Sequence, residues 1–101
     1  MTSLKQYDLY LGHNHPQYPG NPITSREILR FIRGQTLLSC YTLIKAQGAW
    51  DNEIEDTTIL RIIEAEDYAP VAREIARNYK HAFSQQAVLL TITNLNESVL
   101  I

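Results

Sequence analysis

Apolar and polar positions alternate near the start of the chain. In residues 4–12, LKQYDLYLG, Leu9 and Leu11 fall on one face of an extended chain and Tyr10 falls on the other, which is typical of a strand with one buried face. We therefore predict a first strand here. The following stretch, GHNHPQYPGNP (12–22), holds three of the four prolines, so it is expected to be an irregular connection.

The next segment changes to helical periodicity. Thr24 and Glu27 have the spacing of a capping box, in which each side chain accepts from the other residue's backbone N–H. Ile23 and Ile28 have the spacing of a hydrophobic staple, and Gly34 suits the end of a helix. The pattern predicts a first helix that begins after Thr24 and ends near Gly34.

Two apolar segments flank a short polar turn in the middle of the chain. Residues 37–50, LLSCYTLIKAQGAW, contain β-branched and aromatic residues and no proline, and residues 53–65 have a dense apolar centre. Both compositions favour strands. The pair Asp51 and Asn52 between them is typical of a turn. The sequence thus predicts one long hairpin.

A second helix is predicted over about 67–83, with Asp67 as its cap and Pro70 in its first turn. Its apolar residues recur at three- and four-residue spacings and form one stripe: Val71, Ala72, Ile75, Ala76, Tyr79, Ala82 and Phe83. Because Tyr79 lies on this stripe, its hydroxyl is expected to find a buried partner. Residues 86–94, QAVLLTITN, are the last predicted strand.

The predicted order is strand, helix, strand, strand, helix, strand, which is the split βαβ or ferredoxin-like arrangement. The expected fold class is α+β, with a four-stranded antiparallel sheet, two helices on one face and a long hairpin between the second and third strands. A length of 101 residues fits one domain. Its core is expected over about 4–94, followed by an apolar tail over 95–101.

Helices on one face leave the other face of the sheet open. Tyr41, Leu43 and Leu89 are candidates for the open face, although the pattern does not decide which face each one takes. Wide apolar surfaces are rarely left in water. We therefore expect a homo-oligomer, a dimer or a trimer, in which sheets pair between subunits.

Composition narrows the class of protein. A net charge of −2 with 20% charged residues argues against nucleic-acid binding, which usually needs a basic surface. Cys40 is the only cysteine, which excludes an internal disulfide and a four-cysteine zinc site, and its apolar surroundings predict a small buried residue. No signal peptide or membrane span is evident, so a cytoplasmic protein is expected.

Several dispersed residues resemble a known family. The segment YKHAFSQQAVLL (79–90) is similar to the pattern Y-K-x-x-F-x-Q-x-x-V-L, GAW (48–50) closes a strand much as a G-x-W element does, and LYLG (9–12) opens the chain. Together they resemble, over most of residues 7–94, a small bacterial family known only as domain of unknown function 3574. The resemblance implies a ferredoxin-like fold and no assigned activity. The GHNHPQYP loop and the LNESVLI tail do not map onto it.

A weaker likeness exists to the trimeric PII and CutA superfamily. It lies in the long hairpin and in the run from Trp50 to Glu64. Proteins of that superfamily are similar in strand order and bind small ligands or metals at clefts between subunits. The phosphate-contacting motifs of PII proteins are not visible in this sequence. The likeness is one of fold, and a fold hosts many functions.

His13 and His15 stand one residue apart in the proline-rich loop. In an extended chain, imidazoles at i and i+2 point the same way and can share a divalent metal ion. A metal site needs further ligands, and nothing in the sequence brings the available ones near: Asp8, Glu53, Glu55 and His81. A polar loop with solvent-exposed histidines and a loop used for acid/base chemistry are the alternatives. No other cofactor is predicted.

A ligand site, if the chain has one, is placed where the loop from His13 to Tyr18 meets the hairpin around Trp50. Carboxylates at the hairpin tip would suit a cation or a basic partner, or would simply protect the strand edges from aggregation. The sequence has no nucleophile paired with a base, no glycine-rich phosphate loop and no Cys-x-x-Cys pair. No catalytic residue is therefore assigned, and an enzyme is not the favoured interpretation.

The favoured interpretation is a small oligomeric ferredoxin-like module that binds or regulates, with an unknown ligand. One alternative is an enzyme of the dimeric α/β-barrel type, an oxygenase or an isomerase, in which His13 or His15 would act as acid, base or metal ligand. Another is a protein-interaction module whose tail (95–101) or edge strand would add to a partner's sheet.

Overall fold

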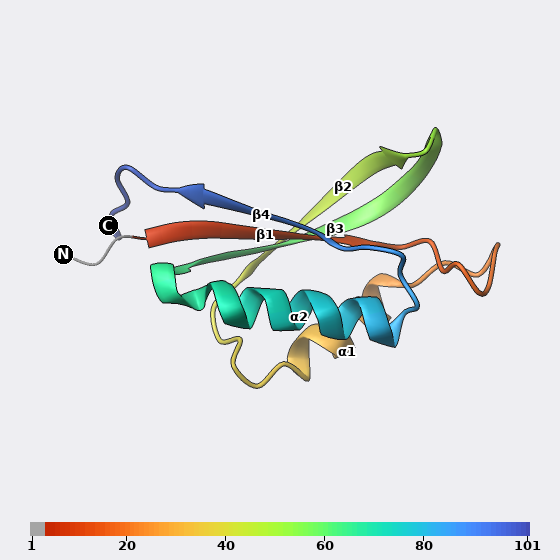
Figure 1. Cartoon of the computed structure of the whole chain (residues 1–101), viewed down its shortest axis with the longest axis horizontal. Helices are drawn as coiled ribbons and strands as arrows, with labels where there is room; N and C mark the ends of the chain where they lie inside the picture. The colour runs from red at the N-terminus through yellow and green to blue at the C-terminus, as the bar shows by residue number, and fades with distance from the viewer. Residues whose placement is uncertain (1–3) are drawn as a thin grey trace.

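The order of elements is βαββαβ, and the fold is the predicted α+β, ferredoxin-like one (Figure 1). The computed structural model describes residues 4–101, apart from the side chains of residues 50 and 66. The elements are β1 (Leu4–Gly12), α1 (Ser25–Arg33), β2 (Thr42–Trp50), β3 (Glu53–Ala65), the 3-10 turn η1 (Glu66–Tyr68), α2 (Ala69–Ala82) and β4 (Leu89–Asn94).

The four strands form one antiparallel sheet in the order β2-β3-β1-β4. Both helices lie on the same face of this sheet (Figure 1). The strand boundaries predicted for β1 and β3 are confirmed. In the part of the chain that the structure describes, no helix is long and apolar enough to cross a membrane.

The hydrophobic core lies between the sheet and the two helices. Its buried side chains come from β1, β3, the two helices and the loop before α1: Tyr7, Leu9, Leu11, Ile23, Ile28, Ile32, Leu60, Ile62, Ala72, Ile75 and Tyr79. The predicted capping box is confirmed, since the Thr24 hydroxyl accepts from the Glu27 N–H (3.1 Å) and the Glu27 carboxylate accepts from the Thr24 N–H (3.3 Å). This cap sets the direction in which α1 leaves the proline-rich loop.

Two predictions are wrong in the segment between α1 and the sheet. Strand β2 begins at Thr42 and not at 37, and residues 35–41 form turns outside the sheet. Cys40 is exposed, so the expectation of a buried cysteine was wrong. The reason is that the chain must cross from the end of α1 to an edge of the sheet, and only Leu38 of this apolar run packs against the core.

The ends of α2 also differ from the prediction. The helix begins at Ala69 after η1, and its first turn has no side-chain cap, so Asp67 is not the cap. A cap at Asp67 would have to bond the N–H of residue 69 or 70, and Pro70 has no N–H to offer. At the other end, β4 begins at Leu89 and not at 86, because the chain first turns at Ser84, which has a positive φ of 52°.

The uncovered face of the sheet, which we call the open face, carries a row of apolar side chains. Strand register places Leu89 beside Tyr10, Tyr10 beside Ile59, and Ile59 beside Ile44. Leu43 instead pairs with Leu60 on the helix-covered face. Leu43 is nevertheless exposed, because β2 is an edge strand.

One ion pair lies on the open face beside the apolar row. The guanidinium of Arg61 donates two hydrogen bonds, both 3.0 Å long, to the carboxylate of Asp8. Gln6 donates a third hydrogen bond to this carboxylate, and Asp8 is buried beneath its partners. The Asp8 hydrogen bonds raise the pKa of Arg61 further above its ordinary value. The pair is therefore a fixed polar feature beside the apolar row.

Candidate functional site

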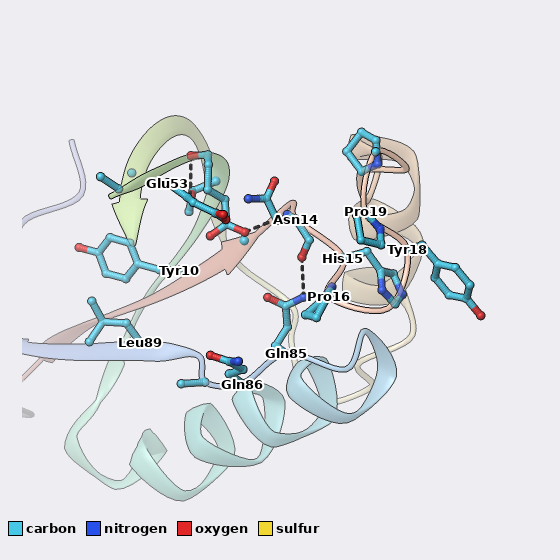
Figure 2. Close-up of a pocket in the computed structure, with 18 residues that line it drawn as sticks. Tyr10, Asn14, His15, Pro16, Tyr18, Pro19, Glu53, Gln85, Gln86 and Leu89 are labelled. Atoms are coloured by element: carbon cyan, nitrogen blue, oxygen red, sulfur yellow. Dashed lines mark hydrogen bonds between the residues drawn. The ribbon is translucent and has the colours of Figure 1, made fainter. Parts of the chain in front are cut away.

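A hollow of about 810 Å³ opens at the end of the sheet where β1 passes into the proline-rich loop. Its walls are the loop, the β2–β3 hairpin and the segment that joins α2 to β4 (Figure 2). We call it the end hollow. Its described lining residues are Tyr10, Gly12, Asn14, His15, Pro16, Tyr18, Pro19, Gly20, Pro22, Gly48, Ala49, Glu53, Glu55, Thr57, Gln85, Gln86, Ala87 and Leu89.

Gly12 lines this hollow, and its missing side chain leaves space that another residue occupies. A Cβ atom at this position would lie 2.7 Å from the carboxylate atoms of Glu55, closer than real Cβ contacts come. The Glu55 carboxylate therefore occupies the space of the missing side chain. There it accepts a hydrogen bond of 2.8 Å from the backbone N–H of Asn14. Glu55 and the first residues of the loop thus hold one another in place.

Two further hydrogen bonds hold the start of the loop from the helix side. The buried hydroxyl of Tyr79 in α2 donates to the Gly12 carbonyl at 2.6 Å. The side-chain amide of Gln85 donates to the Asn14 carbonyl at 3.0 Å (Figure 2). The prediction that the Tyr79 hydroxyl finds a buried partner is confirmed. Burial, and to a lesser extent Glu55 and Glu27, raises the pKa of Tyr79 far above its ordinary value, so this phenol stays protonated and can donate.

His13 faces away from the end hollow. Its Nε2 lies 2.8 Å from the hydroxyl of Thr58, a buried residue of β3. Its backbone N–H donates to the Asp56 carbonyl (2.9 Å), and its carbonyl accepts from Ile23 (2.7 Å), which closes the base of the loop. His13 lines a second, smaller hollow beside Thr24 and Asp56. Its contacts are those of a residue that fastens the loop to β3.

His15 and Tyr18 do line the end hollow, on the loop side. The edge of one ring packs on the other at a centroid distance of 4.7 Å, and His15 Nδ1 accepts from the backbone N–H of Gln17 (3.3 Å). The two histidines thus have different partners and line different hollows. Within residues 4–101, no group of three or more described His, Cys, Asp or Glu side chains is placed to hold a metal ion.

Of the other residues that the sequence suggested for a site, some line the end hollow and others do not. Glu53 and Glu55 line the end hollow, as does the hairpin around them. Trp50 ends β2 opposite Glu53, and its side chain lies outside what the structure describes. Asp8 is engaged by Arg61 on the open face. His81 is exposed near the end of α2 and does not line the hollow.

Sequence reasoning missed the far wall of the hollow, which Gln85, Gln86 and Leu89 form. Tyr10 was placed on the correct face by alternation, but nothing in the pattern joined it to the loop. Register now sets it beside Leu89, and Figure 2 shows both side chains on the same side of the hollow. The glutamines carry no motif, because their position depends on the turn at Ser84 and on the packing of α2.

The lining combines an apolar part with hydrogen-bonding groups. Tyr10, Leu89 and the loop prolines supply the apolar surface, while two carboxylates, three side-chain amides and an imidazole supply donors and acceptors. This mixture is typical of sites that bind small organic molecules. Comparisons with family models, with curated proteins and with solved structures found no match for this chain.

Proposed function

We propose that the protein is a small homo-oligomeric binding module that takes a small organic molecule in the end hollow. The observation that supports the proposal is the fastening of the loop start. Backbone and side-chain groups of residues 12–14 are bonded to β3, α2 and the segment before β4. A wall that is ordered before binding saves the ligand the entropic cost of ordering it.

The size and lining of the hollow agree with this function. Its volume of about 810 Å³ falls within the range of roughly 300–1,000 Å³ that ligand sites span. Gly48, on the hairpin wall, leaves space: a Cβ atom there would meet nothing nearer than the Thr57 hydroxyl at 3.7 Å. A larger side chain at residue 48 would therefore enter the hollow without disturbing the core.

A pair of variants tests binding. Gly48→Leu should project into the hollow and narrow it at the hairpin wall, while Thr42→Leu places the same side chain on the same face of β2, away from it. A set of small fluorinated aromatic fragments is titrated into ¹⁵N-labelled protein. Fragments that shift the amide signals of residues 13–20 and 85–89 in the wild type and in Thr42→Leu, but not in Gly48→Leu, would support the proposal. No such fragment, or fragments that bind Gly48→Leu equally well, would refute it.

The homo-oligomer rests on the open face. The apolar row from Leu89 to Ile44 crosses all four strands, and both helices lie on the opposite face (Figure 1). Packing the Ile59–Ile44 half of this row on that of a second copy would remove it from water, at roughly 25 cal/mol per Å² of apolar surface buried. Tyr10 and Leu89, at the other end of the row, would remain on the wall of the end hollow. We expect a dimer or a trimer for this reason.

Light scattering coupled to size-exclusion chromatography tests the assembly. Ile63 lies on the open face and is 47% exposed, while Ile54 lies on the other face of β3 and is 70% exposed. Ile63→Lys should therefore dissociate the oligomer, and the matched change Ile54→Lys should leave it intact. A monomeric wild type, or equal effects of the two changes, would overturn the assignment of the interface to the open face.

A further inference from the structure

From the charges around the end hollow, we infer the class of its ligand: an organic cation with a primary ammonium group and an aromatic or compact apolar body. The inference rests on the proposed function, because it concerns the same hollow. The hollow itself provides the space and the apolar contact. The carboxylates determine which class of small molecule would bind most tightly in the hollow.

The ionisable groups that line the hollow include carboxylates and one imidazole, that of His15. Among the described lining residues, Glu53 and Glu55 are the two carboxylates, and none is a lysine or an arginine. They are two residues apart on β3, so both project from the same face of the sheet. In the described part of the chain, neither carboxylate forms an ion pair. Their mutual repulsion would be relieved by a cation placed between them.

Glu55 is also held in position before any ligand arrives. The absence of a side chain at Gly12 gives its carboxylate room at the back of the hollow, and the Asn14 N–H holds it there with a bond of 2.8 Å to Oε2. One backbone N–H offsets little of a full negative charge. A ligand ammonium can therefore form a charge-assisted hydrogen bond with a carboxylate whose conformational freedom is already reduced.

The apolar body of the ligand would lie toward the open face. Tyr10 and Leu89 are cross-strand neighbours, and Figure 2 shows their side chains at the end of the hollow away from the loop, with Glu53 and Asn14 between them and His15. A ring on this surface gains stacking with Tyr10, and a nearby ammonium also gains from the ring face of the tyrosine. A molecule that carries both a ring and an ammonium group offers both kinds of contact.

Three probes of similar shape separate charge from apolar contact: benzylammonium, benzyl alcohol and benzoate. A charge-assisted hydrogen bond adds enough over a neutral one for about a tenfold difference in Kd. In NMR titrations of the wild type, we expect benzylammonium to bind about tenfold more tightly than benzyl alcohol, and benzoate to bind most weakly. Added salt should weaken the binding of benzylammonium and leave the binding of benzyl alcohol unchanged.

The double change Glu53→Gln/Glu55→Gln should reduce the tenfold preference to about twofold. Glu74→Gln, an exposed glutamate of α2 paired with Arg77, is the control and should keep the preference. If benzyl alcohol or benzoate binds the wild-type hollow as tightly as benzylammonium, the ligand class is wrong while the hollow remains a binding site. If no probe binds, the class is also overturned, and the fragment titration with Gly48→Leu then decides separately whether the hollow binds anything.

Discussion

The hydrogen bond between Tyr79 and Gly12 links the core to the end hollow, and removing it should be costly. Tyr79→Phe deletes a hydroxyl that donates at 2.6 Å and leaves the buried Gly12 carbonyl without this donor. The ring keeps its contacts with Phe31 and Phe83, at centroid distances of 5.3 and 4.8 Å. The change therefore isolates one hydrogen bond from the packing around it.

The expected magnitude follows from the burial of both partners. A buried carbonyl that loses its donor costs about 1–3 kcal/mol, against a total stability of roughly 5–15 kcal/mol for a domain of this size. At about 4–8 °C per kcal/mol for a small domain, the Tm should fall by about 4 °C at the least. Urea denaturation gives the free energy of unfolding directly, and the slope m should not change, because the fold is the same.

A second tyrosine serves as the control. Tyr18 is 58% exposed, so Tyr18→Phe should alter the free energy of unfolding by less than about 0.5 kcal/mol. Amide hydrogen exchange at His13 and Asn14 should accelerate in Tyr79→Phe alone, because the loop start loses one of its attachments. Equal stabilities of the two variants, with unchanged exchange at these amides, would refute the role assigned to Tyr79.

Three further predictions concern the same framework. Because burial raises the pKa of Tyr79, the folded state keeps a proton that the unfolded state loses above about pH 10. The free energy of unfolding should therefore fall as pH rises through alkaline values. It should fall less steeply in Tyr79→Phe, which lacks this proton. Thr24→Ala removes the hydroxyl that caps α1 and should cost about 1 kcal/mol in urea denaturation. Gly12→Ala should displace the Glu55 carboxylate and accelerate exchange of the Asn14 amide, at a smaller cost in stability than Tyr79→Phe.

Each of these predictions has its own control. Thr93→Ala, at an exposed position of β4, should leave α1 and the stability nearly unchanged, and an equal effect would contradict the capping argument. In Gly48→Ala the new Cβ would make only an ordinary contact of 3.7 Å with the Thr57 hydroxyl, so the Asn14 amide should keep its wild-type exchange rate in that variant. If alkaline pH destabilises Tyr79→Phe as steeply as the wild type, then other groups cause the pH dependence.

Local signals in the sequence were sufficient wherever neighbouring residues settle the structure. The boundaries of β1 and β3 were predicted from the apolar residues of each strand and from the turn residues beside them. The start of α1 follows from the reciprocal bonds of Thr24 and Glu27. The apolar stripe of α2 also placed Tyr79 in the core. Local reasoning failed at residues 37–41 and at Cys40, because an apolar run there spans a connection that the core does not cover.

The candidate site likewise combines features that local residue patterns predict with features that depend on long-range contacts. Residue patterns alone predicted the order of elements, the irregular loop after β1 and a possible site between this loop and the hairpin. The three-dimensional packing was needed to show that His13 is bonded to Thr58 while His15 lines the end hollow, that Glu55 fills the space above Gly12, and that Gln85 completes the far wall. The physical reason is that these contacts join residues more than forty positions apart, and their partners are set by strand register and helix packing, which no local pattern of residues encodes.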